Sequence, residues 1–175
     1  MALTRVKKVP TANLVQGSDF LTTSSNIAAA RLPAGTVIQT VYVAYSSQVS
    51  SNNNTYTTTG LTGSITPTSS SNKILVQVQQ NGVYKDGSNT EGVNIRLLRG
   101  STQIANPAKR AGGDNGDGTA ATMSIGTVGI DVLDAPNTTS AVTYSTEFRA
   151  EGNAGTAYVQ VYTVESTLVL QEIAA

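Results

Sequence analysis

The sequence predicts an all-β fold, an antiparallel β-sandwich of about eight to ten short strands that follows an extended N-terminal arm. Three observations support this prediction. Apolar residues alternate with polar ones over most of the chain, turns rich in Gly, Asn and Ser separate the alternating stretches, and charged residues make up only 13% of the sequence. Alternation with a period of two is typical of strands with one buried face. A length of 175 residues suits one such domain.

The stretch KILVQVQQNGVY, residues 73–84, is the strand around which we expect the rest to be organised. Its apolar residues Ile74, Val76 and Val78 fall on one face of an extended chain, and glutamines fall on the other. A turn rich in Ser and Thr precedes the stretch, and Asn81-Gly82 provides turn residues at its end.

The other strands are expected, in chain order, at residues 37–45, 55–59, 60–67, 93–98, 102–105, 123–133, 142–148, 157–164 and 166–173. Residues 106–121 are predicted to form a long irregular loop because glycines crowd their middle. Two antiparallel sheets of this kind pack either as a jelly roll or as an immunoglobulin-like sandwich. The absence of Cys and Trp favours the jelly roll, since these residues mark many immunoglobulin cores.

The final strand, residues 166–173, is apolar on both faces. Leu168 and Leu170 share one parity, and Val169 and Ile173 share the other. Such a strand needs cover on both sides. We therefore predict that Leu168, Val169, Leu170 and Ile173 lie near a subunit interface.

Residues 1–34 are predicted to form an anchoring arm, and residues 35–175 the β-sandwich domain. The arm contains scattered apolar residues without a sustained period, and its basic residues outnumber its acidic ones. A segment of this kind gains order from contacts with another surface. The residues expected to make those contacts are Lys7, Lys8, Leu14, Val15, Phe20 and Leu21.

The composition excludes most catalytic chemistry. The chain has no Cys and no His, which removes disulfides, thiol nucleophiles, imidazole bases and the usual zinc ligands, so we expect no catalytic residues, no cofactor and no metal. Asp114, Asn115 and Asp117 lack the spacing of a calcium loop. Glu147 and Glu151 fall on a solvated strand face and in a turn, which does not favour an acid pair.

The charge balance and the hydropathy pattern exclude further classes of partner. Lys and Arg total 11, as do Asp and Glu, which gives no overall attraction to nucleic acid. The sequence has no apolar run long enough for a membrane span and no secretory signal pattern, so we expect synthesis in a cytoplasm. The seven tyrosines could line a sugar-binding surface or fill the rim of the core.

Over most of residues 32–173 the chain resembles structural proteins of tailed bacteriophages, especially marine and cyanobacterial phages. The segments that carry the resemblance are LPAGTVIQ (32–39), TGLTGSITPT (59–68), SNKILV (71–76), LLRGSTQI (97–104) and STLVLQEI (166–173). Related sandwiches on virion surfaces form homotrimers. The resemblance therefore implies a non-enzymatic virion protein that is made in the host cytoplasm.

Two positions on the particle fit the resemblance. One is a capsid decoration (cement) protein that docks on the major capsid protein or another virion protein as a homotrimer. The other is the receptor-binding tip of a tail or head fibre, which would bind a host surface glycan. A fibre tip follows an attachment domain and a long shaft, and the roughly 34 residues before the predicted sandwich are too few for both. Decoration is therefore the favoured expectation.

Overall fold

The computed structural model describes residues 32–87, 92–113, 123–151 and 155–175, and Ala34–Ala175 form one compact unit. The predicted arm lies outside the described residues except at its end. Its boundary with the sandwich domain therefore stays a prediction.

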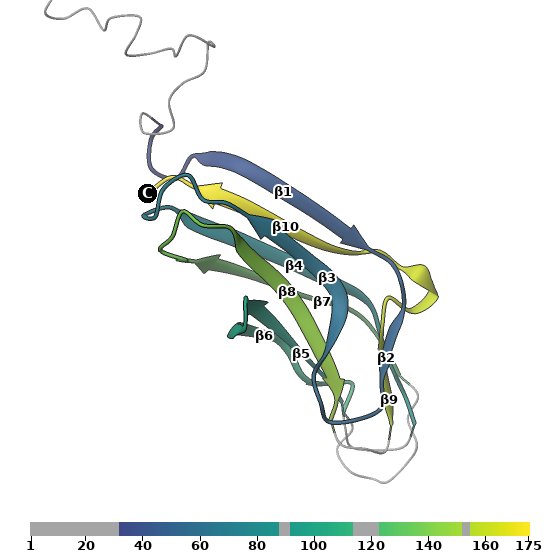
Figure 1. Ribbon diagram of the computed structural model, residues 1–175. Helices are drawn as coiled ribbons and strands as arrows, with labels where there is room; N and C mark the ends of the chain where they lie inside the picture. Colours follow the sequence, from purple (N-terminus) through teal and green to yellow (C-terminus); the bar gives the residue numbers. More distant parts are fainter. Residues whose placement is uncertain (1–31, 88–91, 114–122, 152–154) are drawn as a thin grey trace, which may run out of the picture. The chain divides into compact units, whose positions relative to one another are not determined.

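Within the described residues, the strands form two antiparallel sheets, as the sequence predicts (Figure 1). Sheet A has six strands: β1 (Val37–Tyr45), β2 (Val49–Ser51), β4 (Lys73–Asp86), β7 (Met123–Asp134), β9 (Thr156–Val159) and β10 (Ser166–Ile173). Sheet B has four strands: β3 (Thr57–Ile65), β5 (Val93–Arg99), β6 (Thr102–Ala111) and β8 (Val142–Ala150).

The strand order is that of a jelly roll. In sheet A, β1 pairs with β10 and β2 with β9, while β4 pairs with both β10 and β9 on one side and with β7 on the other. Each of the couples β1/β2 and β9/β10 thus acts as one interrupted strand, which reduces ten strands to eight. Their order is then 1-8-3-6 in sheet A and 2-7-4-5 in sheet B. This order gives the two interlocked Greek keys of a jelly roll.

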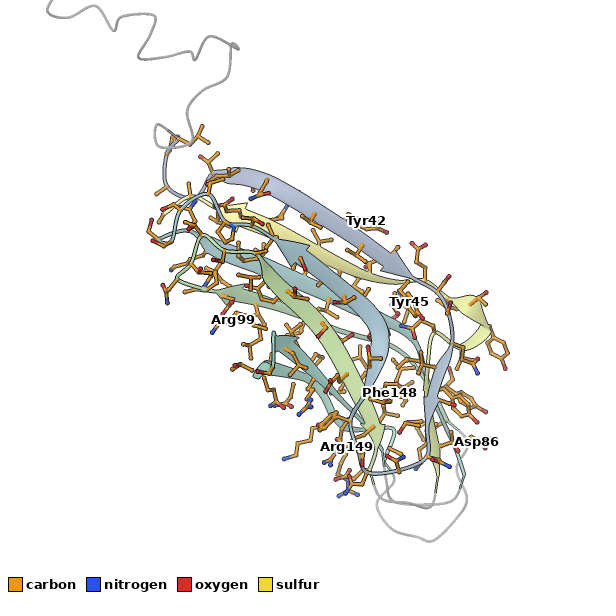
Figure 2. All side chains as sticks on the ribbon, viewed as in Figure 1. Tyr42, Tyr45, Asp86, Arg99, Phe148 and Arg149 are labelled. Carbon is orange, nitrogen blue, oxygen red and sulfur yellow. The ribbon has the colours of Figure 1, made fainter. Side chains whose placement is uncertain are left out.

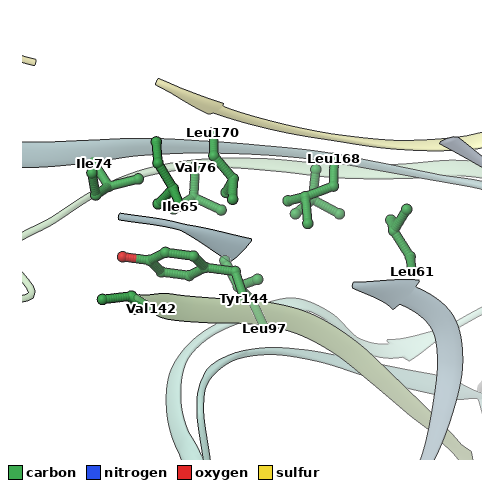
Figure 3. Packing of buried hydrophobic residues seen from close by; sticks show 10 residues of the cluster. Leu61, Ile65, Ile74, Val76, Leu97, Val142, Tyr144, Leu168 and Leu170 are labelled. Carbon is green, nitrogen blue, oxygen red and sulfur yellow. The ribbon is translucent and has the colours of Figure 1, made fainter. Parts of the chain in front are cut away.

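The core lies between the two sheets, and β4 supplies much of it. Ile74, Val76 and Val78 of this strand are buried, as their spacing predicts. Leu168 and Leu170 of the neighbouring β10 join them, and Figure 3 shows this layer facing side chains of sheet B. Each fully buried side chain of this size stabilises the fold by about 1.5–3 kcal/mol.

A second cluster fills the other half of the sandwich. It contains Val83, Val93, Ile95, Phe148 and Val159 among its buried residues. The predicted alternation in β8 is confirmed, because Val142, Tyr144, Thr146 and Phe148 are buried whereas Thr143 is exposed.

Tyr144 also ties the two sheets together at one end. Its hydroxyl donates a hydrogen bond of 2.7 Å to Asp134 Oδ2 at the end of β7. Arg99 Nη1 of sheet B donates to the same carboxylate at 2.8 Å. Burial and this bond to Asp134 raise the pKa of Tyr144 well above its usual value, so the phenol remains the donor at any ordinary pH.

The structure corrects the predicted loop at residues 106–121. Strand β6 continues to Ala111, so the first part of that stretch is extended chain. Pro107 is tolerated because β6 is the edge strand of sheet B, where a missing N–H leaves no ladder bond unmade. The Gly-rich part at residues 114–122 lies outside the described residues.

Three other boundaries differ from the prediction. The two short strands expected at residues 55–59 and 60–67 are replaced by the single strand β3, Thr57–Ile65, with a register shift between Thr58 and Thr62. The short strand β2 was not predicted. Asn81-Gly82 does not end β4, because the chain passes through a β-bulge there and continues to Asp86.

The strand predicted at residues 157–164 is wrong in its second half. Strand β9 ends at Val159, and a connector, residues 160–165, leads into β10. Gln160, Tyr162 and Thr163 all have positive φ angles of 54–60°, and three such residues among four consecutive ones cannot continue an extended strand. Apolar residues at Val161 and Val164 made this connector look like extended chain.

Candidate functional site

The outer face of sheet A is a continuous surface with little charge. Directly opposite residues of antiparallel strands share a face, so the register places Tyr42, Val169, Gln77 and Asp131 in one row. The neighbouring rows follow in the same way: Thr40, Gln171, Leu75 and Leu133; Ala44, Thr167, Gln79 and Gly129; and Val37, Ile173 and Lys73. Lys73 and Asp131 are the charged residues in these rows.

Several large apolar side chains of this face meet solvent. The exposed fractions are 45% for Val37, 61% for Tyr42 and 55% for Leu133. Tyr42 lies on the outer side of β1 (Figure 2). Exposed apolar side chains thus occur in three of the four rows, among mostly uncharged Thr and Gln side chains.

The four residues predicted at a subunit interface divide between the two faces of β10. Leu168 and Leu170 are fully buried in the core of their own domain and have no surface to offer. Val169 and Ile173 are half-buried and lie on the outer face of sheet A. The interface stays a prediction, and it now depends on Val169 and Ile173.

The outer face of sheet B has a different chemistry. Ser64 Oγ and Thr143 Oγ1 share a hydrogen bond of 2.7 Å. Arg96 Nε donates to Glu147 Oε2 at 2.8 Å and its guanidinium lies 4.0 Å from the centre of the Tyr56 ring. Hydroxyls and ion pairs keep this face well solvated. The two faces of the sandwich are therefore suited to different surroundings.

A groove of ≈ 340 Å³ opens between β4, β7 and the connector. Its lining residues are Asn81, Gly82, Val83, Tyr84, Ser124, Gly126, Thr127, Val161, Tyr162 and Val164. Gly82 in β4 and Gly126 in β7 are among these lining residues, and they lie where the register of the two strands shifts. Tyr162 of the connector is 86% exposed.

The connector is fixed to β4 by close packing and by hydrogen bonds. A Cβ atom on Gly82 would come within 2.6 Å of the backbone nitrogen of Val161, so only glycine allows this approach. Gln160 N donates to Asn81 O at 3.0 Å, and Asn81 Nδ2 donates to Glu165 O at 2.6 Å. These contacts hold the connector at both of its ends.

The seven tyrosines do not form a common sugar-binding surface. Tyr144 is in the core, and Tyr45 packs against it from β1. Tyr56 lies beside two arginines, Arg96 and Arg149. The remaining tyrosines are Tyr42 on β1 and Tyr84, Tyr158 and Tyr162, which lie on β4, on β9 and in the connector; Tyr84 and Tyr158 pack edge to face at 5.7 Å.

The acidic candidates have structural partners. Glu147 pairs with Arg96, and Glu151 Oε2 lies 3.1 Å from Arg110 Nε. Within the described ranges, no three His, Cys, Asp or Glu residues are grouped closely enough to hold a metal ion. Asp114, Asn115 and Asp117, whose spacing does not match a calcium loop, lie outside those ranges. So do all six predicted contact residues of the arm.

The groove is the feature that the sequence did not predict. Its residues come from β4, β7 and the connector, which are separated in sequence, and two of the positions that shape it are glycines. Asn81-Gly82 was the available signal, because an Asn-Gly pair inside an otherwise alternating strand indicates either a turn or a bulge. The structure shows a bulge, because β4 pairs with β7 both before and after Asn81-Gly82.

No family model matches the chain, and no curated protein matches it. Among solved structures, the chain is similar to the VP2 subviral particle of infectious bursal disease virus at 12% identity, covering 79% of this chain and 38% of that chain with a TM-score of 0.40. The Gt strain of the same virus gives 13% identity, 79% and 39% coverage and a TM-score of 0.38. A likeness at these TM-scores does not bear on function.

In the described part of the chain, no helix is long and apolar enough to cross a membrane.

Proposed function

We propose that this chain is a non-enzymatic virion structural protein, a capsid decoration (cement) protein that docks on the shell as a homotrimer. The observation that carries the proposal is the outer face of sheet A. Exposed Val37, Tyr42 and Leu133 lie there among half-buried apolar residues, with few charges between them. A face of this kind is suited to burial against another protein.

The occupant that we assign to this face is a second copy of the same chain. Val169 and Ile173 lie there on β10, between β1 and β4, and are directly opposite the exposed Tyr42 and Val37 of β1. A cyclic trimer would bury a side of each subunit in contact with the next. Hydroxyl groups and ion pairs on sheet B suit the opposite face to solvent.

Attachment to the capsid is assigned to the arm, residues 1–34. Lys7 and Lys8 would supply electrostatic attraction to capsid protein, and Leu14, Val15, Phe20 and Leu21 would supply apolar contacts. The end of the arm leads into Gly35, whose N–H donates to Ala174 O at 2.8 Å. The first residues of the sandwich domain therefore lie beside its C-terminal end.

The ion pairs of Glu147 and Glu151 support the non-enzymatic part of the proposal, since both carboxylates are neutralised by arginines. The alternative function is the receptor-binding tip of a fibre. The groove beside Tyr162 is the observation that favours it, because a receptor-binding tip needs a ligand site.

Imaging of tagged particles tests the choice between a decoration protein and a fibre tip. Particles that carry the full chain with a C-terminal gold-binding tag should show label spread over the capsid shell in electron micrographs. Label confined to tail or fibre ends would replace the proposal with the alternative. Particles without any label would overturn both.

A further inference from the structure

The lining of the groove combines aromatic rings with uncharged polar groups. Tyr84 and Tyr162 provide rings, while Asn81, Ser124 and Thr127 provide amide and hydroxyl groups. All of its described lining residues are uncharged. A neutral sugar has the matching surface, because its pyranose ring presents C–H groups on a face and hydroxyls around the edge.

From this chemistry we propose that the groove binds a neutral carbohydrate, with Tyr162 stacking on the sugar ring and Asn81 and Thr127 contacting its hydroxyls. The volume of ≈ 340 Å³ lies at the lower end of the range for small-molecule sites. The inference goes beyond the proposed function and does not depend on it.

Tyr162 lies in a tight turn, in which Thr163 N donates to Gln160 O at 3.0 Å. Its backbone adopts φ 58° and ψ 28°, a left-handed conformation that costs a non-glycine residue free energy. The side chain gains little in return, since 86% of it is exposed. Backbone strain at an exposed aromatic residue is typical of a residue presented for contact.

The polar edge of the groove is fixed before any ligand binds. Thr127 Oγ1 donates to Asn81 Oδ1 at 2.7 Å, and Asn81 Nδ2 donates to the carbonyl of Glu165. The Thr127 oxygen retains capacity to accept a hydrogen bond from a sugar hydroxyl. Fixed side chains lower the entropy cost of binding.

The charges around the groove favour a neutral ligand over an anionic one. No Lys or Arg is among its described lining residues. The side chain of Glu165 is exposed beside it and accepts a hydrogen bond of 3.2 Å from the Tyr42 hydroxyl. A carboxylate on the ligand would find no cation here and a nearby negative charge.

The groove adjoins the rows of the proposed trimer interface on β4. Leu75 of these rows is nine residues from Tyr84 of the groove, but Gln79 is only two residues from Asn81.

Saturation-transfer NMR tests the proposal with methyl glycosides of glucose, galactose, mannose and N-acetylglucosamine, and with glucuronate as an anionic probe. Signal from at least one neutral glycoside and none from glucuronate is expected.

Tyr162→Gly should weaken the binding about tenfold. The substitution also relieves the positive φ, so the variant should fold. Tyr162→Phe should retain most of the binding. Tyr56→Ala, which removes a tyrosine beside Arg96 of sheet B, is the matched control.

Absence of signal from every neutral probe would overturn the proposal. So would unchanged binding by Tyr162→Gly, or equal loss in Tyr56→Ala. Attachment of Tyr162→Gly to particles, measured in parallel, reports separately on the proposed function, because this residue lies outside the arm and the interface rows.

Discussion

Asn72 Nδ2 donates a hydrogen bond of 2.7 Å to Oε1 of Glu172, a carboxylate with no solvent exposure near the end of β10. Thr68 donates to the same oxygen through its backbone N–H at 2.6 Å and its hydroxyl at 2.8 Å, and Gln39 Nε2 donates to Oε2 at 2.6 Å. Burial alone would raise the pKa of Glu172, but these hydrogen bonds outweigh it and lower the pKa. The ionised carboxylate thus joins β1, β10 and the turn before β4.

This carboxylate predicts a specific loss of stability in acid. Since the folded-state pKa lies below the unfolded value of 4.5, the stabilisation is fully present above pH 4.5 and is lost as the pH falls from there through the folded pKa. Urea unfolding of Glu172→Gln should give a free energy of unfolding lower by about 1–3 kcal/mol at pH 7. The difference from the natural chain should shrink at acid pH.

Glu165→Gln is the matched control, because Glu165 is exposed and close in sequence. It should leave the free energy of unfolding at pH 7 nearly unchanged. A Glu172→Gln difference that stays constant from pH 7 to acid pH would contradict the assignment.

Gly82→Ala tests how tightly β4 packs on the connector. The added Cβ would lie 2.6 Å from Val161 N at a φ of +59°. Both the contact and the backbone angle are unfavourable, so we expect the free energy of unfolding to fall by about 2 kcal/mol or more in chemical denaturation.

Gly126→Ala separates the effect of the contact from that of the backbone angle, because φ is +86° there but no atom lies within 4 Å. That variant should lose only about 1–2 kcal/mol. Equal losses in the two variants would show that the close approach at Gly82 is unimportant.

The fold was largely predictable because its signals are local. Alternation in β8 and β10 indicated strands, and the structure confirms the bounds of β10 at Ser166–Ile173. The prediction was wrong where tertiary context decides the local structure. Pro107 is compatible with a strand only because β6 is an edge strand, and Asn81-Gly82 is a bulge only because β7 pairs with β4 on both sides of it.

The functional features were less accessible to sequence reasoning. Two-sided apolar character in β10 was visible, but Leu168 and Leu170 could be assigned to the core only once sheet B was placed opposite them. The groove depends on residues from three elements and on a left-handed Tyr162, which no periodicity indicates.

The outer face of sheet A predicts the result of placing a charge in its middle. In sedimentation velocity, the natural chain should sediment as a trimer, and Val169→Asp should shift it toward monomer because the buried carboxylate would lack a partner. Thr143→Asp, on the exposed face of sheet B, should leave the trimer intact. A natural chain that sediments as a monomer at micromolar concentration, or an unchanged mass for Val169→Asp, would exclude this face as the interface.

Removal of the arm should separate folding from attachment. All strands of the described domain lie between Val37 and Ile173, and the bonds from Gly35 N to Ala174 O and from Ala174 N to Thr36 O remain when residues 1–30 are deleted. We therefore expect the truncated protein to keep its midpoint of thermal unfolding and to lose attachment to particles in co-sedimentation.

The salt dependence of attachment then separates the electrostatic contribution of the arm from its apolar contribution. A variant with Lys7→Ala and Lys8→Ala should bind more weakly at low salt and approach the natural chain at high salt, because exposed charges are screened. A variant with Phe20→Ala and Leu21→Ala should bind more weakly at every salt concentration, since apolar contacts persist. If the truncated protein attaches with unchanged affinity, the arm has no part in anchoring, and the contact with the capsid must lie on the sandwich itself.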